Sequence, residues 1–397
     1  MSGHELPAPV NRKFFTPGVF VLLVLAFVMA CIAVYRFAFV GLAGATNLNQ
    51  EYPWGIWISI DVATGVALAA GGFTTATLAH IFHREHYHAI TRPALLTAML
   101  GYTFVGIGLM FDLGRFYNIW HPVILWQGNS VLFEVGMCVV CYITVLYIEF
   151  LPIICERFET DLRWPKLNRI AMFLNSRLSR IMFLFVIAGT VLSCLHQSSL
   201  GTLMVIAPSK MHDLWDTSVG PLLFLLSAFM VGFPMVIVES LFAGWSLKLK
   251  PEVEILNPLS KYIIFFTGIY LTVKVTDMLV RGSQVHLLEG SVQSYCFIIE
   301  MVFGVIVPFV MLLSARVRNA PGLLFIAALL IVLGVAFNRV NVFLVAYQPP
   351  YVTKTYFPSI FEVAVTVGLI STLMLIYRLA VTYLPVITHP EPTARRA

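Results

Sequence analysis

Charged side chains are scarce in this chain of 397 residues, of which 11% are charged and 59% are hydrophobic. Because a water-soluble domain needs about a quarter of its residues charged to cover its surface, a soluble fold is excluded. Long polar loops are missing as well, and the longest connections, 155–170 and 195–217, are too short to hold a soluble domain. A cleavable signal peptide is not evident either, since the apolar run at 19–40 is long enough to remain in a bilayer as an anchor.

Cysteine and histidine are few where a membrane redox centre would need them. Most of the six cysteines lie inside apolar runs, and their spacing fits neither a disulfide framework nor a metal site. A membrane b-type haem needs axial ligands, usually facing histidines, and none of the ten histidines falls in the middle of a predicted span. The histidines from His80 to His88 fall in one short loop, which is typical of ordinary interfacial residues. We therefore expect no haem, no iron–sulfur cluster and no metal site in this chain.

Long apolar segments, in contrast, recur from end to end of the chain. Each is long enough to cross the hydrocarbon core of a bilayer as a helix. The sequence therefore predicts an all-α integral membrane protein with ten transmembrane helices. The predicted spans are 19–40, 54–81, 93–116, 128–153, 171–194, 218–244, 260–281, 291–314, 321–345 and 358–384.

The positive charges predict the orientation of these spans. Most of the 25 lysines and arginines fall in the terminal segments and the loops that share one side with them. Cytoplasmic loops carry the excess of positive charge, so both termini are expected in the cytoplasm. Two termini on one side require an even number of spans, which agrees with ten.

Polar residues repeat at a nearly constant spacing in the two halves of the chain. The matching residues are Asp112, Arg115 and Glu134 in the first half and Asp277, Arg281 and Glu300 in the second. This predicts a single membrane domain over 1–397, built from two parallel four-helix bundles with one flanking helix on each side. The units are 54–194 and 218–345, and the flanking helices are 19–40 and 358–384. Coincidence among few polar residues is the alternative.

Acidic residues inside spans require a reason, because a charge in hydrocarbon is costly. Asp61 and Glu134 are expected in the outer half of the bilayer, and His196 at the outer end of the fifth span. We predict that these three handle protons in a pocket for quinone, whose reduction takes two electrons and two protons. The residues expected to bind the quinone are Asp112, Arg115, Gln197, Ser198 and Trp54, and those expected to extend a proton path are Glu149, Glu239 and Glu300. The alternative role is structural, since polar side chains also join membrane helices.

Six segments resemble the polysulfide reductase NrfD family, and the whole chain is most similar to its HybB-type branch, the membrane subunits of nickel–iron hydrogenases. The segments are Tyr52-Pro-Trp-Gly-Ile-Trp-Ile-Ser-Ile-Asp61, Ala69-Ala-Gly-Gly72, Arg92-Pro-Ala-Leu-Leu96, Asp112-Leu-Gly-Arg115, Asn129-Ser-Val-Leu-Phe-Glu134 and His196-Gln-Ser-Ser-Leu-Gly201. The resemblance implies two four-helix bundles with extra helices, no haem or other prosthetic group, and a site for menaquinone or ubiquinone near the periplasmic face.

The resemblance also implies partners. A periplasmic ferredoxin-like iron–sulfur subunit is expected to pass electrons between the quinone and the catalytic subunits of a hydrogenase or related oxidoreductase. Apart from these subunits we expect contact with membrane lipid and none with nucleic acid. A molybdenum-enzyme or sulfur-cycle complex is an alternative assembly. A secondary transporter or proton channel, and a passive membrane anchor, are alternatives without redox chemistry.

Overall fold

The fold was analysed in a computed structural model, which describes residues 7–10, 12–159, 163–249, 253–350, 352 and 354–388. Ten helical stretches in this part are long and apolar enough to cross a bilayer, which confirms the predicted all-α membrane fold. The spans are Pro17–Ala45, Trp57–Ile81, His88–Asp112 (α5), Val131–Glu159 (α7), Pro165–Val205 (α8), Gly220–Leu247 (α9), Val253–Arg281 (α10), Val292–Leu313, Pro321–Val345 and Ile360–Tyr383 (α15).

Four of the spans are composed of several helical elements, some of which wind as wider π-helical turns. The first holds α1 (Pro17–Val34), η1 (Tyr35–Val40) and α2 (Gly41–Ala45). The second holds η2 (Trp57–Thr64), α3 (Gly65–Leu68), α4 (Ala70–Ala76) and η3 (Thr77–Ile81). The eighth holds α11 (Val292–Met301), η8 (Val302–Ile306) and α12 (Val307–Leu313), and the ninth holds α14 (Pro321–Val340) and η9 (Asn341–Val345).

Local sequence explains where several helices begin. Proline occupies the first turn of α1, α8, α9 and α14, where its missing N–H costs no helical hydrogen bond. Ser359 precedes α15 and forms a capping box with Glu362, in which each side chain accepts a hydrogen bond from the backbone N–H of the other residue. These signals fix where the five helices begin.

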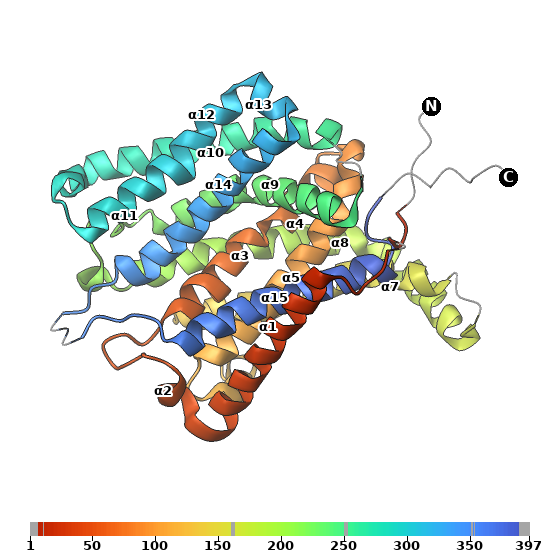
Figure 1. Cartoon of the computed structure of the whole chain (residues 1–397), viewed down its shortest axis with the longest axis horizontal. Helices are drawn as coiled ribbons and strands as arrows, with labels where there is room; N and C mark the ends of the chain where they lie inside the picture. Colours follow the sequence, from red (N-terminus) through yellow and green to blue (C-terminus); the bar gives the residue numbers. More distant parts are fainter. Residues whose placement is uncertain are drawn as a thin grey trace.

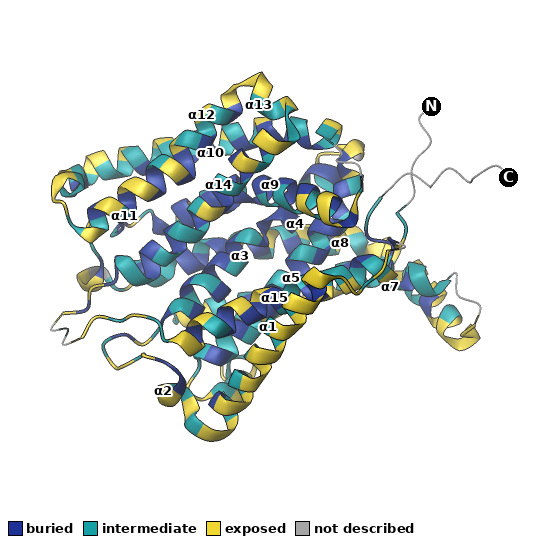
Figure 2. Ribbon diagram, viewed as in Figure 1, coloured by how far each residue is buried: buried dark blue, intermediate teal, exposed yellow. Residues whose placement is uncertain are grey.

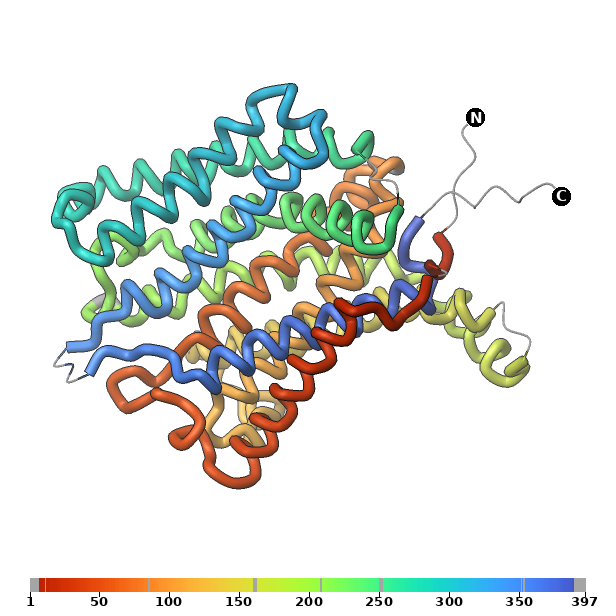
Figure 3. Tube along the Cα trace, in the orientation of Figure 1, coloured from red at the N-terminus to blue at the C-terminus, as the bar shows by residue number. Residues whose placement is uncertain are grey.

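Both ends of the described chain lie on the same face of the helical bundle (Figures 1 and 3). There the backbone N–H of Ala8 donates a 3.1 Å hydrogen bond to the carbonyl of Ile387. We call this side the termini face and the other side the opposite face. An even number of spans accounts for the meeting of the two ends, and the cytoplasmic placement of the termini face stays a prediction.

Helix α9 occupies the centre of the molecule. It packs against α4 and α8 on one side and against α10 and α14 on the other, while α1 packs along α15 at the edge. Figure 2 shows buried residues concentrated along the central helices and exposed residues along α1, as expected for a helix that faces lipid. The division into two parallel four-helix bundles stays a prediction.

Helices α7 and α8 form a hairpin that extends beyond the other helices at the termini face (Figure 1). Helix α8 has 41 residues, and at 1.5 Å per residue it is about 60 Å long, roughly twice the hydrocarbon thickness. The predicted fifth span, 171–194, was therefore too short at both ends. As a result His196 lies inside α8 rather than at its end.

Candidate functional site

A cavity of about 600 Å³ lies among α1, the second span, α5, α9 and α15. Most of its wall is apolar, with Phe104, Phe242 and Leu373 among the lining side chains. Two acids interrupt this wall, Asp61 of η2 and Glu239 of α9. By helix rise, Asp61 lies roughly 6 Å from the opposite-face end of its span, and Glu239 lies roughly 12 Å from the termini-face end of α9. The cavity therefore joins one carboxyl group in each half of the membrane.

Asp61 is held by neighbours on two other helices. Its carboxylate accepts a 2.6 Å hydrogen bond from the hydroxyl of Thr366 on α15, and the residue is only 9% exposed. On α5, a Cβ at Gly108 would lie 2.8 Å from the Cβ of Asp61, so the glycine allows the two helices to approach at this point. The π-helical winding of η2 also suits a functional residue, because such turns are frequent at functional sites. Asp61 is therefore buried between helices, while its predicted role stays a proposal.

Glu239 forms the polar end of the cavity near the termini face. It accepts a 2.8 Å hydrogen bond from the hydroxyl of Tyr377, and both side chains line the cavity. The neighbouring Arg378 also lines the cavity and donates to the carbonyl of Phe14 at 3.2 Å. A carboxyl group next to a phenol, with an anchored guanidinium nearby, can hold and transfer a proton.

Another buried acid, Glu362 of α15, was missed in the sequence. Its side chain accepts hydrogen bonds from the hydroxyl of Tyr356 at 2.6 Å and from the backbone N–H of Asn47 at 3.0 Å. Burial and the bond to Glu362 raise the pKa of Tyr356, which therefore remains a neutral donor. The pattern Ser359-x-x-Glu362 before an apolar run is a helix-start signal in the sequence, and it does not by itself indicate that the acid is buried.

The predicted pair of Asp112 and Arg115 does not form in the described part of the chain. Helix α5 ends at Asp112, so Arg115 leaves the helical face of its partner and is exposed. The positive charge that interacts with Asp112 is instead that of Arg36 of η1, a buried residue whose guanidinium donates to the carbonyls of Phe111 at 3.0 Å and Leu113 at 2.7 Å. Neither Asp112 nor Arg115 lines the cavity.

Glu134 lies far from the position expected of it. Helix α7 begins at Val131, so Glu134 is in the first turn and exposed, rather than nearly two turns into the span. Trp54, expected to contact quinone, donates a 3.0 Å hydrogen bond from its indole N–H to the carbonyl of Phe343. Both residues are absent from the cavity wall. Glu134 and Asp61 therefore do not share a pocket.

His196, Gln197 and Ser198 also lie away from the cavity wall. His196 and Gln197 are fully buried, and Ser198 is half-buried. The Gln197 amide donates to the carbonyl of Val66 at 2.8 Å, which joins α8 to the second span. The His196 ring lies 5.7 Å from the ring of Tyr102, and neither of its nitrogens has a hydrogen-bond partner among the described residues.

The other two acids expected in a proton path lie outside the cavity. Glu149 is half-buried on α7, facing Gly189 of α8. Glu300 of α11 is buried and accepts hydrogen bonds from Trp215 at 3.1 Å, Asn338 at 2.7 Å and Asn341 at 2.8 Å. Of the three predicted acids, only Glu239 therefore reaches the cavity.

Glu300 and Glu134, predicted as repeat equivalents, thus have different environments, because one is buried in a hydrogen-bond network and the other is exposed. The pair of Asp277 and Arg281, in contrast, is present, with Oδ2 and a guanidinium nitrogen 2.8 Å apart. Helix α10 continues to Arg281, so both residues share one helical face.

Comparison with known proteins matches residues 44–350 to the family model of polysulphide reductase, NrfD. A protein of Nitratidesulfovibrio vulgaris is 35% identical over 97% of this chain and 98% of its own length. An Escherichia coli protein described as a probable Ni/Fe-hydrogenase 2 b-type cytochrome subunit is 32% identical over 96% of this chain and 95% of its own length. The integral membrane subunit of a menaquinone reductase from N. vulgaris is 26% identical over 92% and 90% of the two chains.

The name of the E. coli relative contradicts the expectation that the chain carries no haem, because a b-type cytochrome is a haem protein. The expectation relied on finding no histidine inside a span, whereas His196 lies within α8 and neither of its ring nitrogens has a partner among the described residues. His196 offers one axial ligand, but it is the only fully buried histidine in the described chain and its ring faces Tyr102. A haem between two buried histidines therefore does not fit the described residues, and no step below involves haem.

Proposed function

The chain belongs to the polysulphide reductase NrfD family, and from this premise we propose that it exchanges electrons with membrane quinone as one subunit of an oxidoreductase complex. The observation that supports this most directly is the apolar cavity with Asp61 and Glu239 in its wall. A quinone needs an apolar slot for its ring and tail and polar groups for its two oxygens. Carboxyl groups beside the slot can exchange the protons that accompany electron transfer.

The quinone ring is proposed to bind near Asp61 and the tail to follow the apolar wall. Reduction to quinol takes two electrons from a redox partner and two protons. Each of the two quinone oxygens takes up one proton and becomes a hydroxyl group. Asp61 would donate the two protons one at a time to the quinone and be reprotonated through the cavity after each transfer, with Glu239 and Tyr377 supplying the protons from the termini face. The reverse sequence oxidises quinol.

The partner is proposed to be a ferredoxin-like iron–sulfur subunit on the opposite face, close to Asp61. The likeness to a Ni/Fe-hydrogenase subunit supports the proposal that this iron–sulfur subunit exchanges electrons with hydrogenase catalytic subunits. The likeness to a menaquinone reductase subunit supports menaquinone as the substrate. The distribution of positive charge supports a cytoplasmic termini face in a bacterial inner membrane. A proton channel without redox chemistry is the second candidate, because the cavity holds a carboxyl group in each half of the bilayer.

The test uses the intact complex in native membranes, with electron transfer to a water-soluble menaquinone analogue as the readout. Asp61→Asn is expected to lower the rate by roughly 100-fold or more, the usual contribution of a general acid. Glu254→Gln is the control, since Glu254 is an exposed acid in the first turn of α10. An Asp61→Asn complex with the wild-type rate would contradict the proposal. Proton flux in vesicles without an electron donor would favour the channel.

A further inference from the structure

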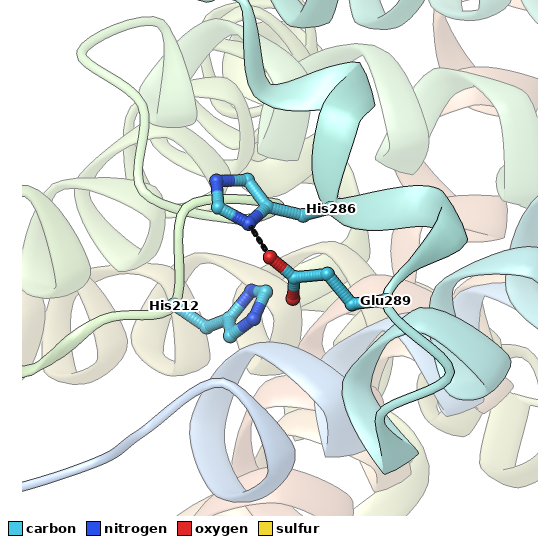
Figure 4. A group of neighbouring side chains, drawn as sticks. All are labelled: His212, His286 and Glu289. Atoms are coloured by element: carbon cyan, nitrogen blue, oxygen red, sulfur yellow. Dashed lines mark hydrogen bonds and ion pairs between the residues drawn. The ribbon is translucent and has the colours of Figure 1, made fainter.

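Two loops on the opposite face bring together three side chains that can ligate a metal ion, His212, His286 and Glu289 (Figure 4). One ligand atom of each residue lies within 4.8 Å of the other two. In Figure 4 the Glu289 carboxylate is turned toward both imidazole rings. We propose that this group binds a zinc ion that fastens the loop between α8 and α9 to the corner between α10 and α11.

Local structure positions His286 and Glu289 as a pair. They flank the end of η7 (Ser283–Leu288), a 3₁₀-helix, in which side chains three residues apart lie above one another. The carbonyl of His286 accepts a 2.5 Å hydrogen bond from Ser294 of α11, which fixes this turn against the next helix. His286 Nδ1 and Glu289 Oε1 form a 2.5 Å hydrogen bond, so these two atoms already face each other. A zinc ion bound to both would replace the hydrogen between them and move them slightly apart.

His212 is fixed from a different part of the chain. Its backbone N–H donates to the carbonyl of Ala346 at 2.8 Å, and Met211 forms an isolated bridge with Tyr347. The rings of His212 and His286 are 5.6 Å apart, centroid to centroid, and meet edge to face. The two histidines are therefore held in place by backbone contacts that do not depend on a metal, as a preorganised site requires.

Asp213 completes the surroundings of the site. Its Oδ2 lies 3.0 Å from Nε2 of His286, on the far side of the ring from Glu289. With a metal at Nδ1, the Nε2–H would donate to Asp213, the arrangement in which a carboxylate orients a metal-bound histidine. Arg281 in turn donates to the Asp213 carbonyl at 2.6 Å and so holds the loop from α10.

Two imidazoles and one carboxylate favour zinc over calcium or magnesium, which prefer oxygen ligands. Three protein ligands leave a fourth position, which water can occupy. The sequence predicts no metal site, because His212 and His286 lie in separate loops and only the fold brings them together.

The site is connected to the buried network of the second half of the chain. The carbonyl of His212 accepts a 2.9 Å hydrogen bond from the backbone N–H of Trp215, whose indole donates to Glu300 at 3.1 Å. A metal that holds the loop would therefore also hold Trp215 against Glu300. Loss of the metal is expected to loosen this contact and to lower thermal stability.

The experiment measures zinc in the purified chain, isolated with an affinity tag free of histidine. The protein is stripped with a chelator, reloaded with zinc and desalted, and its zinc content is measured by mass spectrometry. The wild type is expected to retain one zinc per chain and to gain thermal stability on loading. His286→Ala and Glu289→Gln are expected to lose both the zinc and the stability gain. Asp213→Asn is expected to bind zinc roughly 10- to 100-fold more weakly.

His121→Ala is the matched control, since His121 begins α6 (His121–Ile124) on the same face but lies outside the group. It is expected to retain zinc. Cobalt provides a second readout, because a cobalt-loaded site absorbs visible light and reports its ligands even in a variant of lower stability. A wild type that retains no zinc, or His286→Ala and Glu289→Gln proteins that retain as much as His121→Ala, would overturn the proposal.

Discussion

Thr366→Val tests how Asp61 is positioned. The change removes the hydroxyl that donates to Asp61 at 2.6 Å and keeps the shape of the side chain. A hydrogen bond to a charged group contributes about 1.5–3 kcal/mol. Since 1.4 kcal/mol is a factor of ten, the rate of electron transfer to quinone is expected to fall by roughly 10- to 150-fold if this bond is needed in the transition state.

The assay separates kcat from KM, using the intact complex and a water-soluble quinone analogue. A positioning role predicts a lower kcat with little change in KM, because the hydroxyl acts through Asp61 and not on the quinone itself. Thr366→Ser keeps the hydroxyl and is expected to retain most of the activity. Equal kcat values for the valine and serine variants would refute the role assigned to this hydrogen bond.

Three further changes probe other parts of the molecule. Glu134→Gln is expected to leave quinone turnover within about twofold of the wild type, since Glu134 is exposed. A large loss of turnover would instead show that the quinone site includes Glu134 of α7. Gly304→Ala would place a Cβ 2.6 Å from the Cα of Gly334. This overpacking is expected to lower the free energy of unfolding by about 1–3 kcal/mol, measured as a lower Tm. An unchanged Tm would contradict the close contact between the two helices. Tyr356→Phe removes a donor to buried Glu362 and is expected to cost about 1 kcal/mol of stability, a loss that should be absent if the bond is not formed.

The sequence predicts the helices of this protein better than the contacts between them. Ten spans follow from long apolar runs, because the bilayer imposes a minimum length on each helix. Asp61 also stands out in the sequence as an acid within a span, because a charge in hydrocarbon is costly. Helix ends are less predictable. Because the predicted ends differ by a few residues from the observed start of α7 and end of α5, Glu134 was expected inside a span and Asp112 was expected to pair with Arg115.

The cavity itself could not have been predicted, because its wall comes from five spans that meet only in the folded chain. Glu239 illustrates the limit. Its place in the second half of α9 is evident from the sequence, but its neighbour Tyr377 lies 138 residues further on. Glu362 differs, since its capping pattern was available in the sequence but indicated a helix start rather than a buried acid.

The α7–α8 hairpin has a practical consequence for imaging. A rod that continues well beyond the other helices makes the molecule asymmetric along the membrane normal (Figure 1). In a low-resolution electron microscopy map of the complex, this rod would mark the termini face before separate helices are resolved. Density for a docked partner could then be assigned at once to the face near Asp61 or to the face near Glu239.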